Sequence, residues 1–114
     1  MRHKYRAKPT TCIHGHKHAS KREAARCVEL HMLQQAGEIA DLEVEPQFWF
    51  VINGEQLKHS NGRRAGYKPD FGYTERGSDI VEDIKSDATM TEAFTLRATL
   101  FRALFPAIEL RVVK

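Results

Sequence analysis

The sequence of 114 residues lacks the features that mark several specialised classes of protein. No run approaches the roughly 18 consecutive apolar residues that a membrane helix needs, and no apolar stretch follows the basic N-terminus as it would in a secretory leader. Its two cysteines, Cys12 and Cys27, are too few for a disulfide framework. Internal repeats, low-complexity segments and linkers are also missing. We therefore expect one globular domain over residues 1–114, located in the cytoplasm.

Charge is distributed unevenly along the chain. Residues 1–30 carry eight Lys and Arg against two acidic residues, a net charge of +6, whereas the other residues carry ten against thirteen, a net charge of −3. A basic segment beside a mildly acidic body is typical of a protein that binds a phosphate backbone, although a solvated terminus has the same composition. We expect residues 1–19 to form a basic N-terminal arm. The candidate DNA-binding residues are Arg2, Lys4, Arg6, Lys8, Lys21 and Arg22.

Two helices are predicted from capping signals. The first runs from Ser20 to about Gly37, because Ser20 and Glu23 have the spacing of a capping box and glycine commonly follows a helix. The second follows Thr89 and Glu92, which repeat that spacing.

Strand signals lie between the helices and after the second one. They fall at residues 47–52, from residue 55 after the Asn53-Gly54 turn, at residues 71–73, and at residues 80–85 after a turn at residues 75–78. A last strand is predicted at residues 108–113, parallel to residues 80–85 because strand, helix and strand form a right-handed crossover. The predicted order is αββββαβ, an α/β fold with a central mixed sheet flanked by helices.

Three residues form the strongest candidate site. Asp83 and Lys85 are two apart in a predicted strand, so their side chains leave the same face of the sheet. If the preceding turn is centred between residues 76 and 77, facing residues have numbers that sum to 153, which places Asp70 opposite Asp83. Like charges at facing positions are destabilising unless something intervenes, and a divalent cation is the natural candidate.

The chemistry of this group indicates phosphodiester hydrolysis. Carboxylate oxygens suit Mg²⁺ or Mn²⁺, which keep several waters and readily accept phosphate oxygens. Such a metal polarises a phosphate and activates a bound water, while Lys85 would stabilise the developing negative charge. The alternative is structural, with Asp70 capping a turn after Pro69 and the other two residues forming a surface ion pair.

Two segments together resemble a known motif. Lys68-Pro69-Asp70-Phe71, followed by Glu82-Asp83-Ile84-Lys85, looks like the PD-(D/E)xK motif of restriction-endonuclease-like nucleases, with Asp83 at the variable acidic position. The chain also resembles a family of small phage and prophage proteins, domain of unknown function 1064. The segments that carry this second resemblance are residues 4–8, 20–24, 67–73 and 81–85. The superfamily resemblance implies a restriction-endonuclease-like fold and a Mg²⁺-dependent DNA endonuclease.

The resemblance also implies a role for a glutamate on the first helix. Some small junction-resolving members place a further catalytic glutamate there, and Glu23 matches that position as a catalytic and metal-binding residue. Glu23 is equally explained as the capping partner of Ser20. Glu82 is a reserve ligand, because strand alternation turns it to the opposite face from Asp83. The superfamily's glutamine-tyrosine motif after the lysine has no match here. Arg97 and Arg102 would contact phosphate instead, although arginines on a helix surface are more often simply solvated.

A second set of residues offers a competing metal site. Cysteine and histidine alternate with other residues from position 12 to position 18, and a cysteine and a histidine lie four apart on the first helix. Together these side chains could hold a structural Zn²⁺. The alternative is a basic loop and a helix that buries its cysteine as a small hydrophobic residue. The candidate ligands are Cys12, His14, His16, His18, Cys27 and His31.

Aromatic residues are the remaining signal. Phe48, Trp49 and Phe50 are expected to be mostly core, facing alternate sides of a strand, and are not expected to stack on bases. Tyr67 and Tyr73 lie near the candidate site, where packing is the expected role.

The leading expectation is therefore an endonuclease that cuts branched or structured DNA, such as a four-way (Holliday) junction. A dimer is expected in that case, because such a junction offers two symmetric cuts. The alternative is a DNA-binding or packaging accessory protein without turnover, and a third reading is a zinc-stabilised DNA-binding module.

Overall fold

A four-stranded mixed sheet forms the centre of the molecule. In the computed structural model, which describes residues 10–11, 17–18 and 20–114, the strand order is β10-β9-β8-β3. Strand β9 pairs in parallel with β10 and antiparallel with β8, which in turn pairs antiparallel with β3. The strands are β3 (Ala40–Val44), β8 (Phe71–Glu75), β9 (Ser78–Ile84) and β10 (Ile108–Val113). The predicted α/β class, the mixed sheet and the parallel last strand are confirmed.

A two-residue turn joins β8 to β9 and sets their register. Arg76 and Gly77 have φ values of 53° and 80°, the left-handed pair that a type I′ hairpin requires. Facing residues follow the predicted sum of 153, with Phe71 opposite Glu82 and Tyr73 opposite Ile80. Continuing this register by one residue places Asp70 at the position facing Asp83.

Two helices flank the sheet. Helix α1 (Lys21–Gln35) is capped as predicted, because the Ser20 hydroxyl accepts a hydrogen bond of 3.1 Å from the Glu23 backbone N–H. Helix α2 (Glu92–Leu104) is capped by Thr91, whose hydroxyl accepts from the Phe94 N–H at 3.1 Å. The predicted cap at Thr89 is wrong by two residues, because that side chain closes a turn with Ser86 instead. No helix of the described residues has the length and apolar character to cross a membrane.

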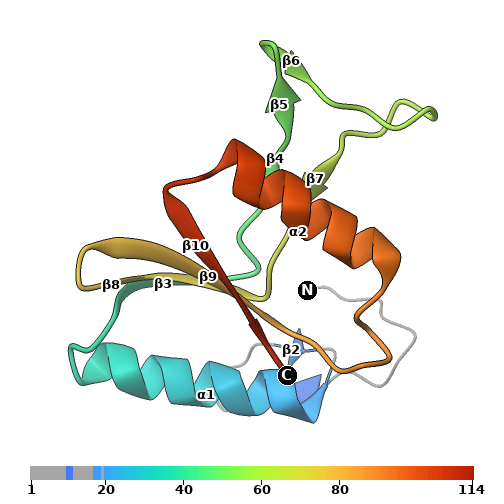
Figure 1. Ribbon diagram of the computed structural model, residues 1–114. Helices are drawn as coiled ribbons and strands as arrows, with labels where there is room; N and C mark the ends of the chain where they lie inside the picture. The colour runs from blue at the N-terminus through green and yellow to red at the C-terminus, as the bar shows by residue number, and fades with distance from the viewer. Residues whose placement is uncertain (1–9, 12–16, 19) are drawn as a thin grey trace.

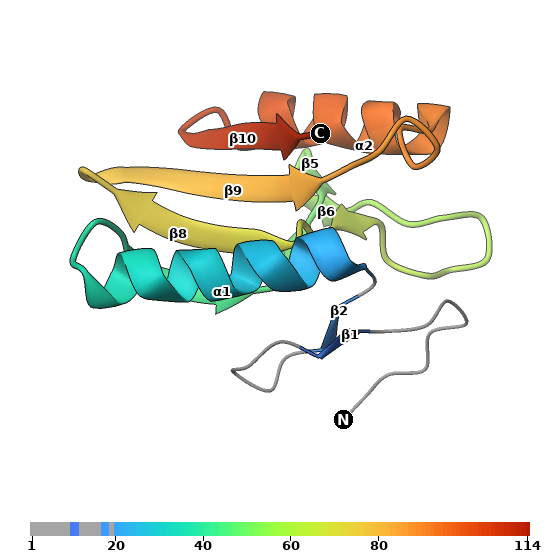
Figure 2. The same cartoon turned by 90° about the horizontal axis from the view of Figure 1, so that it is seen from below.

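The helices cover opposite faces of the sheet (Figures 1 and 2). Because side chains alternate along a strand, Ile80 of β9 packs in the core beneath α1, whereas Val81 packs in the core beneath α2. The core on the α1 side contains Ala24, Cys27, Leu30, Ile39, Phe71, Tyr73 and Ile80. The core on the α2 side contains Phe50, Ala65, Tyr67, Val81, Phe94, Ala98, Phe101 and Leu110.

The fourth sheet strand and the segment after it differ from the prediction. Strand β3 was not predicted, because it contains two acidic residues and a bulge at which Asp41 adopts a left-handed φ of 57°. The strands predicted at 47–52 and from 55 form hairpins outside the central sheet, so the αββββαβ order does not describe the sheet itself. The hairpin strands are β4 (Phe48–Trp49), β5 (Val51–Ile52), β6 (Glu55–Gln56) and β7 (Gly66–Tyr67). Another short pair, β1 (Thr10–Thr11) with β2 (Lys17–His18), occurs where irregular structure was expected.

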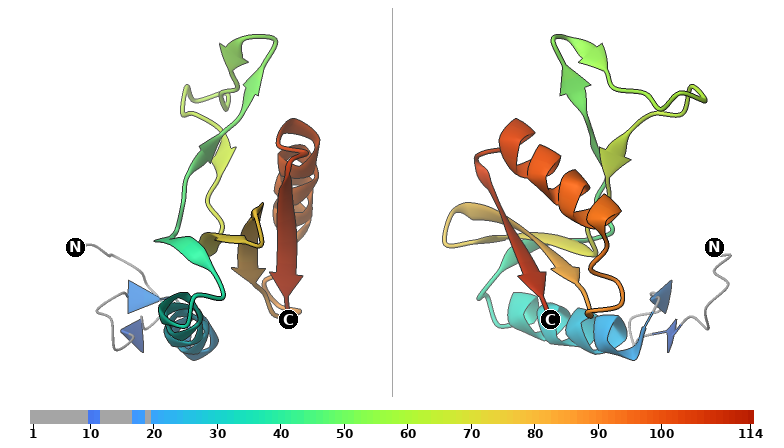
Figure 3. Two further views of the ribbon diagram at one scale, coloured as in Figure 1. Left: turned by 90° about the vertical axis from the view of Figure 1, so that its left-hand side faces the viewer. Right: turned by 45° about the vertical axis from the view of Figure 1, so that its right-hand side comes forward.

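Residues 48–67 form an arm that projects from the body beside α2 (Figure 3). Its base is anchored in the core, where the Phe48 ring lies 5.1 Å from that of Phe101 in an edge-on arrangement. Further out, the Gln56 side-chain amide nitrogen lies within 3.0 Å of three backbone carbonyl oxygens of the arm. The predicted Asn53-Gly54 turn is confirmed at its tip, between β5 and β6. The arm is therefore braced by its own hydrogen bonds.

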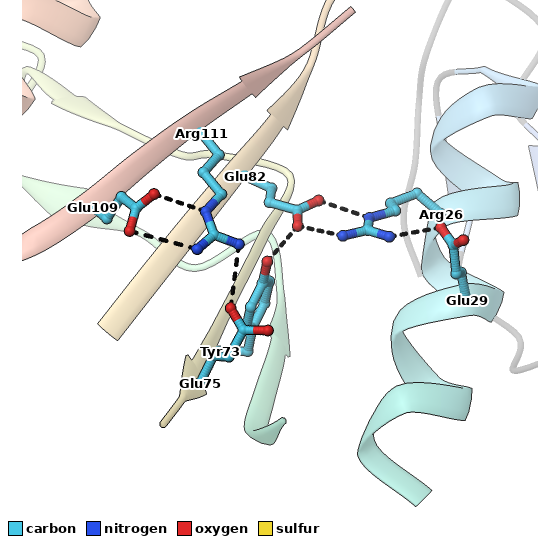
Figure 4. Close-up of polar contacts among 7 residues, drawn as sticks. All are labelled: Arg26, Glu29, Tyr73, Glu75, Glu82, Glu109 and Arg111. Atoms are coloured by element: carbon cyan, nitrogen blue, oxygen red, sulfur yellow. Dashed lines mark hydrogen bonds and ion pairs between the residues drawn. The ribbon is translucent and has the colours of Figure 1, made fainter. Parts of the chain in front are cut away.

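An ion pair ties α1 to β9 (Figure 4). The Arg26 guanidinium donates to both Glu82 carboxylate oxygens, at 2.8 and 2.6 Å, and the Tyr73 hydroxyl also donates to Glu82. Glu82 is only 1% exposed. Burial raises the pKa of Glu82, but the hydrogen bonds from Arg26 and Tyr73 outweigh it, and the pKa lies below its ordinary range. Glu82 is therefore an ionised residue whose carboxylate is occupied by Arg26 and Tyr73, and its reserve role as a metal ligand stays a prediction.

Replacing Arg26 with alanine is expected to destabilise the fold by about 3–4 kcal/mol, because it leaves a buried carboxylate without its counter-ion. The double variant Arg26→Met/Glu82→Leu should recover most of this loss, since neither charge is then buried. Glu29, the exposed second partner of Arg26, serves as control, and Glu29→Ala should cost less than about 1 kcal/mol. Urea unfolding measures all three. A double variant as unstable as the single one would contradict this account.

Candidate active site

Asp70 and Asp83 meet at the end of the sheet where β9 finishes and β8 begins. The Asp70 carboxylate accepts a 2.7 Å hydrogen bond from the Ile84 backbone N–H, the residue after Asp83. Its backbone carbonyl accepts another, of 2.8 Å, from the N–H of Glu45 at the end of β3. These two bonds hold Asp70 between neighbouring strands, with its side chain beside that of Asp83.

The proximity of the carboxylates changes their protonation. Burial, then the charges of Asp83 and Glu23, raise the pKa of Asp70 to about 9, although the Ile84 N–H acts in the opposite direction. A hydrogen bond between Asp70 and Asp83 contributes to the same shift. Without a cation, the pair therefore holds a proton between them at neutral pH.

Lys85 is positioned beside this pair. Its Nζ lies 3.5 Å from Asp83 Oδ1 and 4.3 Å from the centre of the Phe94 ring on α2. The side chain is only 20% exposed, so its ammonium is held close to the carboxylates. Lys85 directly follows β9, and its ion pair with Asp83 confirms that the two side chains lie on the same side of the sheet.

Tyr67 from the base of the arm also contacts Asp83. Its hydroxyl donates a hydrogen bond to Asp83 Oδ2. Burial, and then this hydrogen bond to Asp83, raise the pKa of Tyr67 well above its ordinary range, so the hydroxyl stays protonated and remains a donor. Packing was the expected role of Tyr67. The spacing Tyr67-Lys68-Pro69-Asp70 did not reveal the contact, because it depends on how β7 lies across the sheet.

Glu23 lies at the start of α1 and is 6% exposed. Its backbone N–H makes the predicted cap with Ser20, and its charge helps to raise the pKa of Asp70. The side chain is therefore electrostatically part of the site. Within residues 20–114, however, no group of three or more His, Cys, Asp or Glu side chains is arranged to hold a metal ion.

A cavity of about 520 Å³ opens above the two carboxylates. Its floor contains Asp70, Asp83 and Lys85, and Tyr67 and Phe94 line its wall. Basic side chains surround this cavity. They come from the arm of residues 48–67, from the segment before Asp70 and from α2. They are His59, Arg63, Arg64, Lys68 and Arg97.

Most of these basic residues were not singled out from the sequence. Arg97 was, but Arg63 and Arg64 lie in a stretch that showed only turn signals. Their position five to seven residues before the Pro69-Asp70 pair was the available clue. Arg102, expected with Arg97 as a phosphate contact, instead lies near the Leu110 carbonyl oxygen and does not line the cavity.

The predicted DNA-binding residues fall into two groups. Arg2, Lys4, Arg6 and Lys8 lie outside the described residues. Lys21 and Arg22 are exposed at the start of α1, and an Arg22 guanidinium nitrogen lies 3.3 Å from the Lys85 backbone oxygen. Arg22 therefore lies next to the candidate site.

The competing zinc ligands are only partly described. Cys12, His14, His16 and the side chain of His18 lie outside the described residues. Cys27 is buried in the core on the α1 side, and its Sγ lies 3.7 Å from His31 Nδ1. That nitrogen also lies 2.8 Å from the Cys27 carbonyl oxygen.

The residues at the candidate site fit a divalent cation of the Mg²⁺ or Mn²⁺ type. Two adjacent carboxylates that must share a proton when alone provide a negative, all-oxygen donor set. Mg²⁺ is commonly bound by one or two carboxylates together with waters and substrate phosphates, so a complete protein cage is not required. Asp70 and Asp83 would hold it, with Glu23 nearby.

The raised pKa of Asp70 leads to a stability prediction for the metal-free protein. Because the folded pKa of about 9 exceeds the ordinary 3.8, this carboxyl stabilises the fold below about pH 4, and the contribution is lost as pH rises through 9. Asp70→Asn, which stays neutral, should therefore melt several degrees above wild type near pH 9 in EDTA. The difference should narrow toward pH 4.

Thermal unfolding at several pH values tests this. Asp79→Asn changes an exposed aspartate of β9 that lies away from the Asp70-Asp83 pair, and it should follow the wild-type pH dependence. An Asp70→Asn difference that does not vary with pH would contradict the prediction.

Comparison with known proteins identifies one family and no individual relative. No curated protein and no solved structure matches it. A family described as "Protein of unknown function (DUF1064)" matches residues 2–114, which confirms the second resemblance found in the sequence. The chain therefore belongs to the DUF1064 family.

Proposed function

We propose that this protein is a metal-dependent endonuclease of the PD-(D/E)xK type that hydrolyses phosphodiester bonds in DNA. The observation that carries the proposal is the Asp70-Asp83 pair with Lys85 3.5 Å from Asp83, on the floor of a cavity surrounded by basic side chains. Carboxylates favour a cation and the surrounding basic groups favour an anion. A phosphodiester bound through Mg²⁺ satisfies both requirements.

Each residue then has a physical role. A bound Mg²⁺ would polarise the scissile phosphate and lower the pKa of an attacking water. Asp70 is oriented by the Ile84 N–H, and Asp83 by the Tyr67 hydroxyl, so both carboxylates are held before substrate arrives. Lys85 supplies a positive charge beside Asp83, where negative charge develops on the phosphate oxygens.

The basic residues around the cavity would bind the DNA backbone on either side of the cut. Arg63, Arg64 and Arg97 can each contact a phosphate with two donors, which fixes the strand relative to the carboxylates. The basic N-terminal arm, residues 1–19, would extend this contact. We infer branched or structured DNA as the substrate, and a dimer if that substrate is a four-way junction.

Cleavage of a DNA panel tests the proposal. Linear, nicked, flapped and four-way DNA are incubated with Mg²⁺ or Mn²⁺, and products are resolved on denaturing gels. Asp83→Asn should reduce the rate about a thousandfold, since several kcal/mol of transition-state stabilisation depends on the metal. Lys85→Ala should reduce it about a hundredfold or more.

Asp79→Asn provides the matched control, because it removes an exposed carboxylate from the same face of β9 and should leave the rate unchanged. DNA binding without cleavage of any substrate under either metal would reject the enzyme proposal. It would favour a binding or packaging protein instead.

A second prediction separates the roles of two tyrosines. Tyr67→Phe and Tyr73→Phe each remove a hydroxyl that donates to a buried carboxylate, on opposite faces of the sheet. Tyr67→Phe should weaken Mn²⁺ binding and reduce cleavage by about 10–100-fold, because Tyr67 orients a metal ligand. Tyr73→Phe should lower the melting temperature but leave Mn²⁺ affinity unchanged. Titration of Mn²⁺ by calorimetry measures both variants, and equal effects would contradict the assigned roles.

A further inference from the structure

An exposed tryptophan lies at the rim of the candidate active site. Phe48 and Phe50 on either side of Trp49 pack into the core against α2, as the alternation of a strand requires. Trp49 faces the other way, is 37% exposed and lines the same cavity as Asp70 and Asp83. Its side chain therefore lies at the cavity and not in the core, where it was expected to pack.

The indole ring is held in place from two sides. The Arg64 guanidinium carbon lies 3.9 Å from the centre of the Trp49 ring, which places the cation over its face. On the paired strand, a Cβ added to Gly66 would lie 2.9 Å from Trp49 Cε3 and 2.4 Å from the Phe48 carbonyl oxygen. Gly66 therefore permits the close approach of β7 that supports the ring. The result is a fixed platform of indole and guanidinium.

Positive charge surrounds this platform. Arg63 and Arg64 are exposed, Arg97 is half-buried, and none of the three makes an ion pair within the part of the chain that the structure describes. The charge of Arg97 also reaches Tyr67 on the cavity wall, where it opposes the upward shift of the tyrosine pKa. Among the described residues these guanidinium groups therefore have no carboxylate partner, so Arg63 and Arg97 can contact phosphate while Arg64 lies over the indole ring.

We propose that Trp49 and Arg64 bind one unpaired nucleotide of a DNA strand, stacking on its base while Arg63 and Arg97 contact the adjoining phosphates. A base inside a duplex is covered on both faces by its neighbours, so only an unstacked base can stack on this platform, in which the guanidinium covers a face of the indole ring. A cavity of about 520 Å³ is of the size that holds a single small ligand. The substrate class is thus DNA in which the strand beside the carboxylates is single-stranded, such as a flap or splayed end.

This inference rests on the proposed function, because it concerns the strand presented to Asp70 and Asp83. Binding can nevertheless be measured without cleavage. Trp49 is the one tryptophan of the sequence, so intrinsic fluorescence reports directly on the proposed platform. The probes are a 12-nucleotide oligo(dT) and a blunt duplex of the same length, both titrated in EDTA.

Oligo(dT) should quench the emission and bind more tightly than the duplex. Trp49→Ala, followed with a labelled oligonucleotide, should lose about tenfold in oligo(dT) affinity, the effect of one lost base stack, and less than about twofold in duplex affinity. Trp49→Phe, which keeps an aromatic face and preserves the packing against Gly66, should retain most of the binding. Arg64→Ala should also weaken oligo(dT) binding, whereas Arg102→Ala, which removes the same charge outside the cavity, should not.

Quenching by duplex equal to that by oligo(dT), or unchanged oligo(dT) affinity in Trp49→Ala, would overturn the inference. The two proposals fail separately. If the protein cleaves duplex DNA with Mg²⁺ while oligo(dT) leaves the emission unchanged, the platform is wrong and the nuclease stands. If oligo(dT) binds as expected and no DNA is cut, the platform stands and the nuclease is wrong.

Discussion

The turn at Arg76 and Gly77 is the constraint on which the rest of the structure depends. Its left-handed backbone allows only two residues between β8 and β9, and so determines which side chains face each other along both strands. A shift of one residue would turn Asp83 toward α1 and bring Glu82 under the arm. The placement of the carboxylate pair and the division of the core between the two helices therefore share one local cause.

Each face of β9 carries a buried carboxylate, but the charge around the carboxylate differs between the two faces. Glu82 and Asp83 are both buried, and each accepts a hydrogen bond from a tyrosine hydroxyl. A guanidinium neutralises Glu82, which makes that carboxylate a stable link between helix and sheet. Asp83 instead lies beside the carboxylate of Asp70, and in the part of the chain that the structure describes its ion-pair partner is Lys85. Burial alone does not distinguish these two carboxylates, whereas the balance of charge around each of them does.

Features encoded by neighbouring residues were predictable from the sequence, and features encoded by distant ones were not. The Ser20 cap and the register of β8 with β9 follow from short motifs, so Asp70, Asp83 and Lys85 could be grouped without a structure. Strand β3 could not be recognised, because its bulge at Asp41 breaks the alternation that marks a strand. The basic cavity wall was also hidden, since residues 58–65 acquire their position only when the arm folds against α2.

The arm is inserted between two neighbouring strands of the sheet, and the hydrogen bonds of its outer part close within residues 50–65. The pairing of β3 with β8 does not pass through it. Variation in the length or sequence of the outer part of the arm can therefore accumulate without altering the spacing of the carboxylates, whereas Tyr67 at its base contacts Asp83. Under the proposed nuclease function, relatives with the same carboxylate pair but different arms would be free to diverge in the nucleic acids they select, so that recognition evolves separately from chemistry.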